Sequence, residues 1–244
     1  MKNNLISKKA IIGKNLKIGN FVTISEGVII GDNCEIESYC HLGYSNKKEN
    51  GPLVIGDNAL IRSHSVIYLG STIAENLMTG HHTTIRENSV IGKNFQLGSQ
   101  SIVMGELTIG DYVKTGSNVE IGQNSNIGNF VWIYLNTTLI NDKYPPSEEI
   151  LGPKVGDFSI IGAHSLIYPG VTIGKDCLIG SGCFLLRDLS DSTIAVGNPS
   201  REIGPVSKIK IESSSSSAYP WRYRFHRGYP EELVKKWMEE VDKL

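Results

Sequence analysis

An aliphatic side chain recurs at every sixth position over most of this chain. The recurrence runs through residues 12–42, 55–139 and 155–185. In these runs 25 of the 27 positions are Ile, Leu or Val, and the exceptions are Thr79 and Thr115. A helix needs a period near 3.6 and an ordinary strand a period of 2. A period of six, with Gly and Asn or Asp after many of the aliphatic residues, therefore predicts short strands separated by turns.

Over about residues 11–200 these repeats resemble those of the hexapeptide-repeat proteins. The resemblance implies an all-β fold, a left-handed parallel β-helix with three hexapeptides per coil and a triangular cross-section. The 27 hexads would then form about nine coils, and at about 4.8 Å per coil the prism would stand about 43 Å tall.

The cysteines occupy one particular position in the repeat, four residues after an aliphatic position. Small residues share this position elsewhere in the chain, which predicts that it faces inward. We therefore interpret the cysteines as small buried hydrophobic residues rather than as a disulfide or a metal site. They are Cys34, Cys40, Cys177 and Cys183.

The repeat is interrupted twice. Residues 43–54 read as a polar loop, and residues 140–154 contain three prolines, which cannot donate to a parallel ladder. We expect the chain to leave the helix at the second interruption. Long ordered loops on a rigid scaffold often carry function, and a tolerated surface insertion is the alternative.

Two segments are similar to bacterial sugar acyltransferases, in particular the nucleotide-sugar N-acetyltransferases. Residues 140–145, INDKYP, match a TND-x-YP segment at the root of such a loop. Residues 161–202 are similar to C-terminal coils that hold coenzyme A, and end in the GNPSR of residues 197–201. The resemblance implies acetyl-CoA or another acyl-CoA as cosubstrate, no metal, and a homotrimer with the grooves between subunits.

Coenzyme A needs backbone groups along its pantetheine arm and cations near its phosphates. Lys175 and Arg201 are candidates for the phosphates as charge-assisted donors, and a solvated surface charge is the alternative for Lys175. The exposed coil edges that suit the arm are Gly162, Ala163, Gly180 and Ser181.

Acyl transfer requires the acceptor to lose a proton and a donor to stabilise the oxyanion. The resemblance places this chemistry at Asn141, which would contact the acceptor amine, and at Asp142. Asp142 is a candidate proton acceptor or ammonium partner, and a turn cap is the alternative. A free amine needs no protein base once its ammonium proton is gone.

His81 is the third catalytic candidate, because it stands where the repeat lacks an aliphatic residue. Hexad counting places it three coils and one face from Asn141, or about 14 Å along the axis. It would bind the nucleotide or the sugar, or act as the base if this axial separation is wrong.

The remaining histidines of the repeat favour structural roles. His64 and His82 are 18 residues apart, and His164 shares their place in the repeat. All three are expected at coil corners. A carbonic anhydrase of the γ type would need three histidines on zinc, and no third histidine is evident beside the first two.

These features predict a coenzyme A-dependent acyltransferase that acetylates the amino group of a nucleotide-linked amino sugar in surface-polysaccharide biosynthesis. An O-acetyltransferase with His81 as its base is the near alternative. A non-catalytic scaffold is the other, because a fold alone does not confer activity.

Composition limits the partners. A formal net charge of −1 over 244 residues gives no indication of a nucleic-acid partner. The N-terminus lacks the apolar core of a signal peptide, and no stretch approaches the 18 or so apolar residues of a membrane span. We expect a cytoplasmic protein without a membrane partner.

The domain prediction is a β-helix over residues 1–206, a Ser-rich linker over 207–218 and a tail over 219–244. Pro230 would begin a helix whose apolar face packs on a neighbouring subunit or on the end of the prism. Residues 221–227 are rich in aromatic rings and cations and are expected to dock the tail, or alternatively to cover a groove and touch a phosphate or a base. The apolar face consists of Leu233, Val234, Trp237, Val241 and Leu244.

Overall fold

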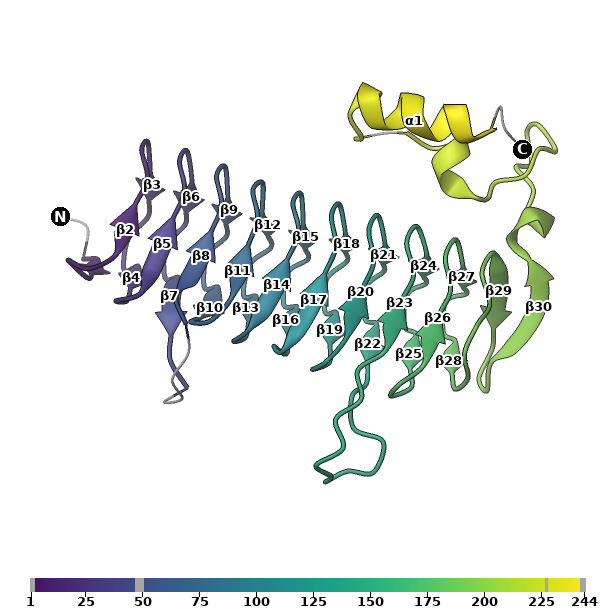
Figure 1. Cartoon of the computed structure of the whole chain (residues 1–244), viewed down its shortest axis with the longest axis horizontal. Coiled ribbons are helices and arrows are strands. Elements are labelled where there is room, and N and C mark those ends of the chain that lie inside the picture. The colour runs from purple at the N-terminus through teal and green to yellow at the C-terminus, as the bar shows by residue number, and fades with distance from the viewer. Residues whose placement is uncertain (1–2, 47–50, 227, 242–244) are drawn as a thin grey trace.

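The computed structural model describes residues 3–46, 51–226 and 228–241 of the chain. Within these residues three parallel sheets form the sides of a long triangular prism, and a short helix lies along its side near the C-terminal end (Figure 1). The fold is the parallel β-helix that the repeat predicts. Among the described residues, no helix has the length and apolar character to cross a membrane.

Each sheet collects every third strand of the chain. Sheet A contains, in spatial order, β1 (Leu5–Ile6), β4 (Thr23–Ile24), β7 (His41–Tyr44), β10 (Val66–Tyr68), β13 (Thr84–Ile85), β16 (Ile102–Val103), β19 (Glu120–Ile121), β22 (Thr138–Leu139), β25 (Leu166–Ile167) and β28 (Phe184–Leu185). Sheet B contains β2 (Ile11–Ile12), β5 (Val28–Ile30), β8 (Leu53–Ile55), β11 (Thr72–Ile73), β14 (Ser89–Ile91), β17 (Leu107–Ile109), β20 (Asn126–Ile127), β23 (Lys154–Val155) and β26 (Thr172–Ile173).

Sheet C carries the C-terminal end of the prism. It contains β3 (Lys17–Ile18), β6 (Glu35–Ile36), β9 (Leu60–Ile61), β12 (Met78–Thr79), β15 (Gln96–Leu97), β18 (Lys114–Thr115), β21 (Trp132–Ile133), β24 (Ile160–Ile161), β27 (Leu178–Ile179), β29 (Thr193–Val196) and β30 (Arg201–Pro205). β30 runs antiparallel to β29, whereas the other pairs are parallel. We call the turns between successive sheets the AB, BC and CA corners.

The described coils number about ten, one more than the nine predicted. The 27 counted hexads correspond to β2 to β28. The difference arises at both ends, because β1 precedes them, with Leu5 and Ile6 paired to Thr23 and Ile24, and β29 and β30 follow them. A regular coil is 18 residues long, as in the pairing of Ile73 with Ile91. At about 4.8 Å per coil the prism is about 48 Å tall.

The aliphatic positions form the core, as predicted. The residues at the six-residue repeat positions from Ile24 to Leu185 are buried, apart from Thr115, and stack into columns along the axis. Thr79 keeps its place in the core because its Oγ1 accepts a hydrogen bond from the Arg62 amide, at 2.9 Å. The four cysteines are free and buried, and burial raises the pKa of Cys40 and Cys183 to about 11.

The corners explain the recurring Asn and His residues. His64, His82 and His164 have φ of 62°, 56° and 59°, in the left-handed region that Asn and His tolerate better than most residues. They occupy the CA corner together with Gln100, Asn118 and Asn136. The predicted corner role of these histidines is confirmed.

Both interruptions of the repeat leave the prism at the AB corner. The first follows β7 and the second follows β22, and Figure 1 shows both extending on the same side of the prism. Five coils separate them, or about 24 Å. Part of the first loop, residues 47–50, lies outside the described residues.

The tail folds back along the prism instead of covering its end. After the turns η1 (Val206–Lys208) and η2 (Trp221–Tyr223), the helix α1 (Glu231–Val241) buries Trp237 against Phe130 and Phe158 of the BC corner. The Ser-rich segment between the turns forms a bridge between Lys210 and Ser217. Leu244, assigned to the apolar face of the helix, lies outside the described residues.

We predict that Trp237→Ala detaches the tail and costs about 3–5 kcal/mol of tail docking, because a fully packed indole is removed. Limited proteolysis should then cleave the chain between residues 206 and 230. Met238→Ala is the matched control, since Met238 is 38% exposed. Equal protease resistance of the two variants would contradict this role for Trp237.

Candidate functional site

A groove on the outside of sheet C holds the candidate coenzyme A residues of the CA corner. Its volume is about 380 Å³, and Gly162, Gly180 and Ser181 line it. The opposite wall is formed by Tyr219 of the tail and Ile203 of β30. The structure therefore gathers these predicted residues into one concave surface.

Two backbone amides of the CA corner are open, one at Ser181, which lines the groove, and one at Ala163, next to the lining residue Gly162. On the same corner the His81 amide donates to Ser99 Oγ at 3.1 Å. The amides of Ala163 and Ser181 donate to no acceptor among the described residues. Extended amide-rich chains such as pantetheine offer acceptors of the kind these two groups need. The residues present fit the cosubstrate that the resemblance implies.

The glycines are required by the close stacking of the coils. A Cβ on Gly162 would lie 2.6 Å from the Ser181 nitrogen. The Gly162 and Gly180 carbonyls are already occupied, by the hydroxyls of Thr137 and Ser165 at 3.1 Å each. The groove therefore offers donors rather than acceptors.

Arg201 and Lys175 lie in different places. Arg201, exposed on β30, borders a hollow of about 470 Å³ together with Arg187 at the C-terminal end of the prism. Lys175 lies at the BC corner with its Nζ 5.4 Å from the centre of the Phe158 ring. Arg201 is thus near the end of the groove, whereas Lys175 belongs to the region where the tail docks.

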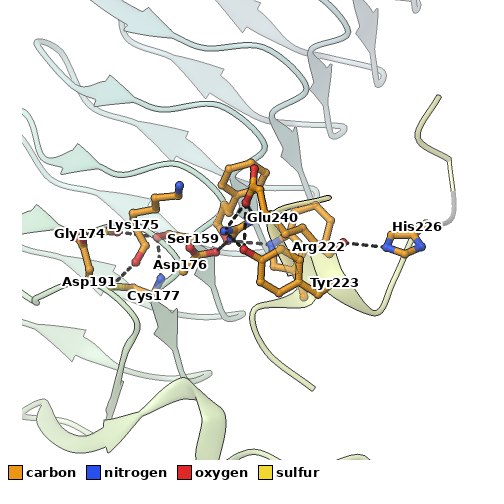
Figure 2. A network of polar contacts seen from close by, with 12 residues as sticks. Ser159, Gly174, Lys175, Asp176, Cys177, Asp191, Arg222, Tyr223, His226 and Glu240 are labelled. Carbon is orange, nitrogen blue, oxygen red and sulfur yellow. Dashed lines mark hydrogen bonds and ion pairs between the residues drawn. The ribbon is translucent and has the colours of Figure 1, made fainter. Parts of the chain in front are cut away.

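A buried ion pair holds the tail at that region (Figure 2). The Arg222 guanidinium binds Asp176 and also Glu240 of α1, and its Cζ lies 4.4 Å from the centre of the Phe158 ring. Arg222 and Asp176 are both at least 90% buried. Burial raises the pKa of Asp176, against the opposing effect of the Arg222 charge. Trp221 and Arg222 thus dock the tail, which was the first role predicted for residues 221–227. Arg227 lies outside the described residues.

The loop of residues 140–153 is closed at its neck. Asp142 and Ile150 form an antiparallel bridge, and the Leu151 amide donates to the Asn141 carbonyl at 2.7 Å. Asn124 of the coil below donates to the Ile150 carbonyl at 2.9 Å. The loop is therefore an ordered projection from the AB corner.

Asp142 caps the turn inside this loop. Its carboxylate accepts the Ser147 hydroxyl at 2.7 Å, the Tyr144 amide at 2.9 Å and the Ser147 amide at 3.0 Å. The Ser147 hydroxyl, with the two amides, holds the pKa of Asp142 below its ordinary value. A carboxylate so well supplied with donors is a poor proton acceptor, so the turn-cap alternative describes its contacts.

Asn141 is better placed to meet a ligand. Its side chain is half-buried and forms no hydrogen bond with any described residue. Gly122 lies directly beneath it, since a Cβ there would be 3.0 Å from Asn141 Cβ. Because Gly122 has no side chain, there is room for the Asn141 side chain directly above it.

His81 has polar partners on the N-terminal half of sheet C. Its Nδ1 lies 2.9 Å from Ser63 Oγ and 3.8 Å from Glu37 Oε2. Glu37 is in turn paired with Arg62 at 2.6 Å. About half of the His81 side chain is exposed, so the ring is accessible from outside.

One chain does not bring all the predicted site residues together. Asn141 and Asp142 follow β22 at the AB corner, whereas His81, Gly162 and Gly180 follow strands of sheet C at the CA corner. Four coils, or about 19 Å, separate His81 from Gly162 along the shared corner. The described residues contain no group of three or more His, Cys, Asp or Glu side chains arranged to hold a metal ion.

The sequence did not identify Tyr134, Ile160 and Tyr219 as lining residues. Tyr134 and Ile160 stand at ordinary outward positions of the repeat, where any residue fits the coil. Tyr219 joins them only because the tail folds back. The density of aromatic residues in 219–229 was the one available signal.

The period, the corners and the prism define a parallel β-helix fold built from six-residue repeats. The family model for the bacterial transferase hexapeptide (six repeats) matches residues 9–43, 88–123 and 152–187, and the 18-residue coils continue between these stretches, as in the pairing of Val66 with Thr84 and of Glu120 with Thr138. The fold is similar to that in a crystal structure of UDP-N-acetylglucosamine acyltransferase, with a TM-score of 0.54 and 23% identity. The match covers 84% of this chain and 73% of the other chain. That likeness establishes the shared fold.

Several relatives are acetyltransferases. The chain is 35% identical over 79 residues to the dTDP-3-amino-3,6-dideoxy-alpha-D-galactopyranose 3-N-acetyltransferase of Aneurinibacillus thermoaerophilus, covering 30% of this chain and 41% of the relative. It is 31% identical over 105 residues to the galactoside O-acetyltransferase of Escherichia coli K12, and the match covers 36% of this chain and 52% of that relative. The chain thus spans about half or less of the length of these relatives.

We predict that Asp142→Ala loosens the loop at neutral pH, whereas the wild-type loop loosens only in acid. A lowered carboxyl pKa stabilises the loop above the ordinary value of 3.8, and this contribution is lost as the pH falls through the lowered pKa. Hydrogen-exchange protection of the Tyr144 and Ser147 amides would report it. Glu148→Ala is the control, and full protection in Asp142→Ala at pH 7 would refute the cap.

Proposed function

We propose that this protein is a coenzyme A-dependent acyltransferase, which transfers an acetyl group to the amine of a nucleotide-linked amino sugar. The observation that carries the proposal is the groove on sheet C together with the open amides of Ser181, which lines it, and of Ala163, next to the lining residue Gly162. The similarity to acetyltransferases, including one for a dTDP-linked amino sugar, supports the same chemistry. Surface-polysaccharide biosynthesis is the pathway class that uses such products.

The reaction requires little of the protein beyond placement. The neutral amine nitrogen attacks the thioester carbonyl, a C–N bond forms, the C–S bond breaks, and the amine proton leaves with the thiolate as a thiol. Asn141 would hold the amine or the developing oxyanion through its unpaired amide. Asp142 would keep the loop in shape and add a negative charge near an incoming ammonium.

We further propose that the complete site forms between copies of the chain, in a homotrimer. The loop root at the AB corner and the groove at the CA corner lie on different edges of one prism. A neighbouring copy that offers its AB corner to this groove would bring Asn141 to the open amides. The projection of the ordered loop beyond the coils supports this arrangement (Figure 1).

An O-acetyltransferase is the second candidate, and His81 is the observation that favours it. Hydroxyl acceptors need a general base, and His81 is accessible and oriented by Ser63 and Glu37. The similarity to the galactoside O-acetyltransferase belongs with this alternative. The carbonic anhydrase alternative gains no support, since His64 and His82 stack ring on ring at 4.5 Å.

The first experiment incubates the protein with acetyl-CoA and a panel of dTDP- and UDP-linked 3-amino and 4-amino sugars. We expect thiol release with one amino sugar and a product heavier by one acetyl group. Hydroxyl sugars and longer acyl donors form the second panel. If coenzyme A binds but no thiol is released in the first panel, the acceptor is a hydroxyl sugar or the donor carries a longer acyl chain, which the second panel tests. If coenzyme A does not bind, the transferase proposal is refuted.

Two variants separate the candidate reactions. Asn141→Ala should lower kcat/KM for the amino sugar about tenfold to a hundredfold, the effect of losing one hydrogen bond to a group that gains charge. His81→Ala should change mainly the acceptor KM in the N-transfer reaction. If His81→Ala instead slows turnover itself by a factor of about a hundred or more, the histidine acts as a general base and O-transfer is favoured.

A further inference from the structure

The docked tail creates an aromatic pocket next to the groove. It encloses about 350 Å³, the lower end of the range for small-ligand sites. Trp132 and Tyr134 of the prism form one wall, and Tyr219, Trp221, Phe225 and Tyr229 of the tail form the other. Tyr134, Ile160 and Tyr219 line both this pocket and the groove, so the two cavities are neighbours.

Two of these rings are left open. Phe225 is 49% exposed and Tyr134 is 45% exposed, although both lie at a cavity wall. The other rings are fixed in place. Trp132 Nε1 donates to the Tyr229 hydroxyl at 2.9 Å, and Trp221 Nε1 donates to the Phe158 carbonyl at 2.8 Å. Each wall therefore combines a fixed ring with an exposed one, an arrangement that suits a flat ligand between the walls.

A cation, Lys114, stands beside the pocket with no acidic partner in the part of the chain that the structure describes. Lys114 Nζ lies 4.8 Å from the centre of the Trp132 ring and 4.7 Å from that of Tyr229. No carboxylate among the described residues forms an ion pair with it. Burial alone lowers the pKa of Lys114, as expected for a cation that lacks a counter-ion. Lys114 lines an adjoining hollow of about 210 Å³, which Trp132 and Tyr134 also line. A positive charge without a described counter-ion therefore stands next to the stacking surfaces of the pocket.

We propose that this pocket binds the base of a nucleotide, with Lys114 facing a phosphate. Planar bases stack on Trp, Tyr and Phe, and a phosphate supplies the anion that Lys114 lacks. An aliphatic acyl chain would suit aliphatic walls better, and it would leave the lysine unpaired. The proposal rests on the proposed function for its two sources of base: the adenine of coenzyme A, or the nucleotide of the acceptor.

Intrinsic fluorescence can report occupancy, because all three tryptophans of the chain, Trp132, Trp221 and Trp237, lie at or beside this pocket. The full chain is titrated with adenosine 3′,5′-bisphosphate, UDP and dTDP. We expect saturable quenching by at least one nucleotide. Quenching by the adenosine bisphosphate, with competition by coenzyme A, assigns the pocket to the cosubstrate; quenching by UDP or dTDP assigns it to the acceptor.

Variants test whether the quenching comes from this pocket. Phe225→Ala and Lys114→Met should each weaken the binding about tenfold, or about 1.4 kcal/mol. Phe21→Ala and Lys17→Met are matched controls, since Phe21 is 47% exposed and Lys17 stands on sheet C near the N-terminal end. Both should bind as the wild type does. Because Phe225 is about half exposed and lies outside the buried cluster of Trp221, Trp237 and Phe158, its removal should leave the tail docked, which proteolysis can confirm.

Two results would overturn the proposal. One is nucleotide affinity unchanged in both pocket variants. The other is quenching by an acyl-pantetheine lacking the nucleotide while no nucleotide binds. Failure of the proposed function is distinguishable: nucleotide binding lost in the pocket variants of a protein without turnover would support the site and refute the reaction. If turnover is present and neither turnover nor nucleotide binding is affected by Phe225→Ala and Lys114→Met, the reaction is supported and the nucleotide site in this pocket is refuted.

Discussion

The parallel ladder between residues 18 apart is the constraint on which the structure depends. Each coil can stack on the next only if its inward side chains fill the same axial columns, so an aliphatic residue must return every six positions. The same stacking forces glycine where coils approach closely and left-handed backbone at the corners. Once these requirements are met, the outward positions are free to vary, and the groove, the aromatic pocket and the loop all use that freedom.

The sequence predicted most of the prism for this reason. The inward columns, the buried cysteines and the corner histidines follow from a period that packing enforces. The count of coils was one short because β1 precedes the first counted hexad and β29 and β30 follow the last one. The tail was placed on the end of the prism or on a neighbour, whereas it lies on the side, where Phe130 and Phe158 receive Trp237. Local pattern gave the helix but not its partner, since tertiary contacts between distant segments have no period.

The candidate site was predictable only in part, and the residues show why. Gly162, Gly180 and Ser181 were found because they belong to the repeat and to a recognisable C-terminal motif, and the structure gathers them in one groove. Lys175 was drawn from the same segment, but the three-sided coil turns it toward the tail. Asp142 proved to be satisfied by its own loop. Tyr134 and Lys114 carried no signal of their own, because the aromatic pocket beside them exists only after the tail has docked. Phe225 belongs to the aromatic and basic segment 221–227, for which contact with a phosphate or a base was the alternative role.

The shared exit of the two loops has a geometric consequence. Both leave from the AB corner, so their separation along the prism is a whole number of coils, five in this chain. Inserting or deleting one coil of 18 residues would change that separation by about 4.8 Å and keep both loops on the same edge. A shorter insertion would rotate one loop to another edge or break the ladder. The distance between the two projecting loops can therefore change during evolution only by whole coils, if both loops are to stay on the same edge of the prism.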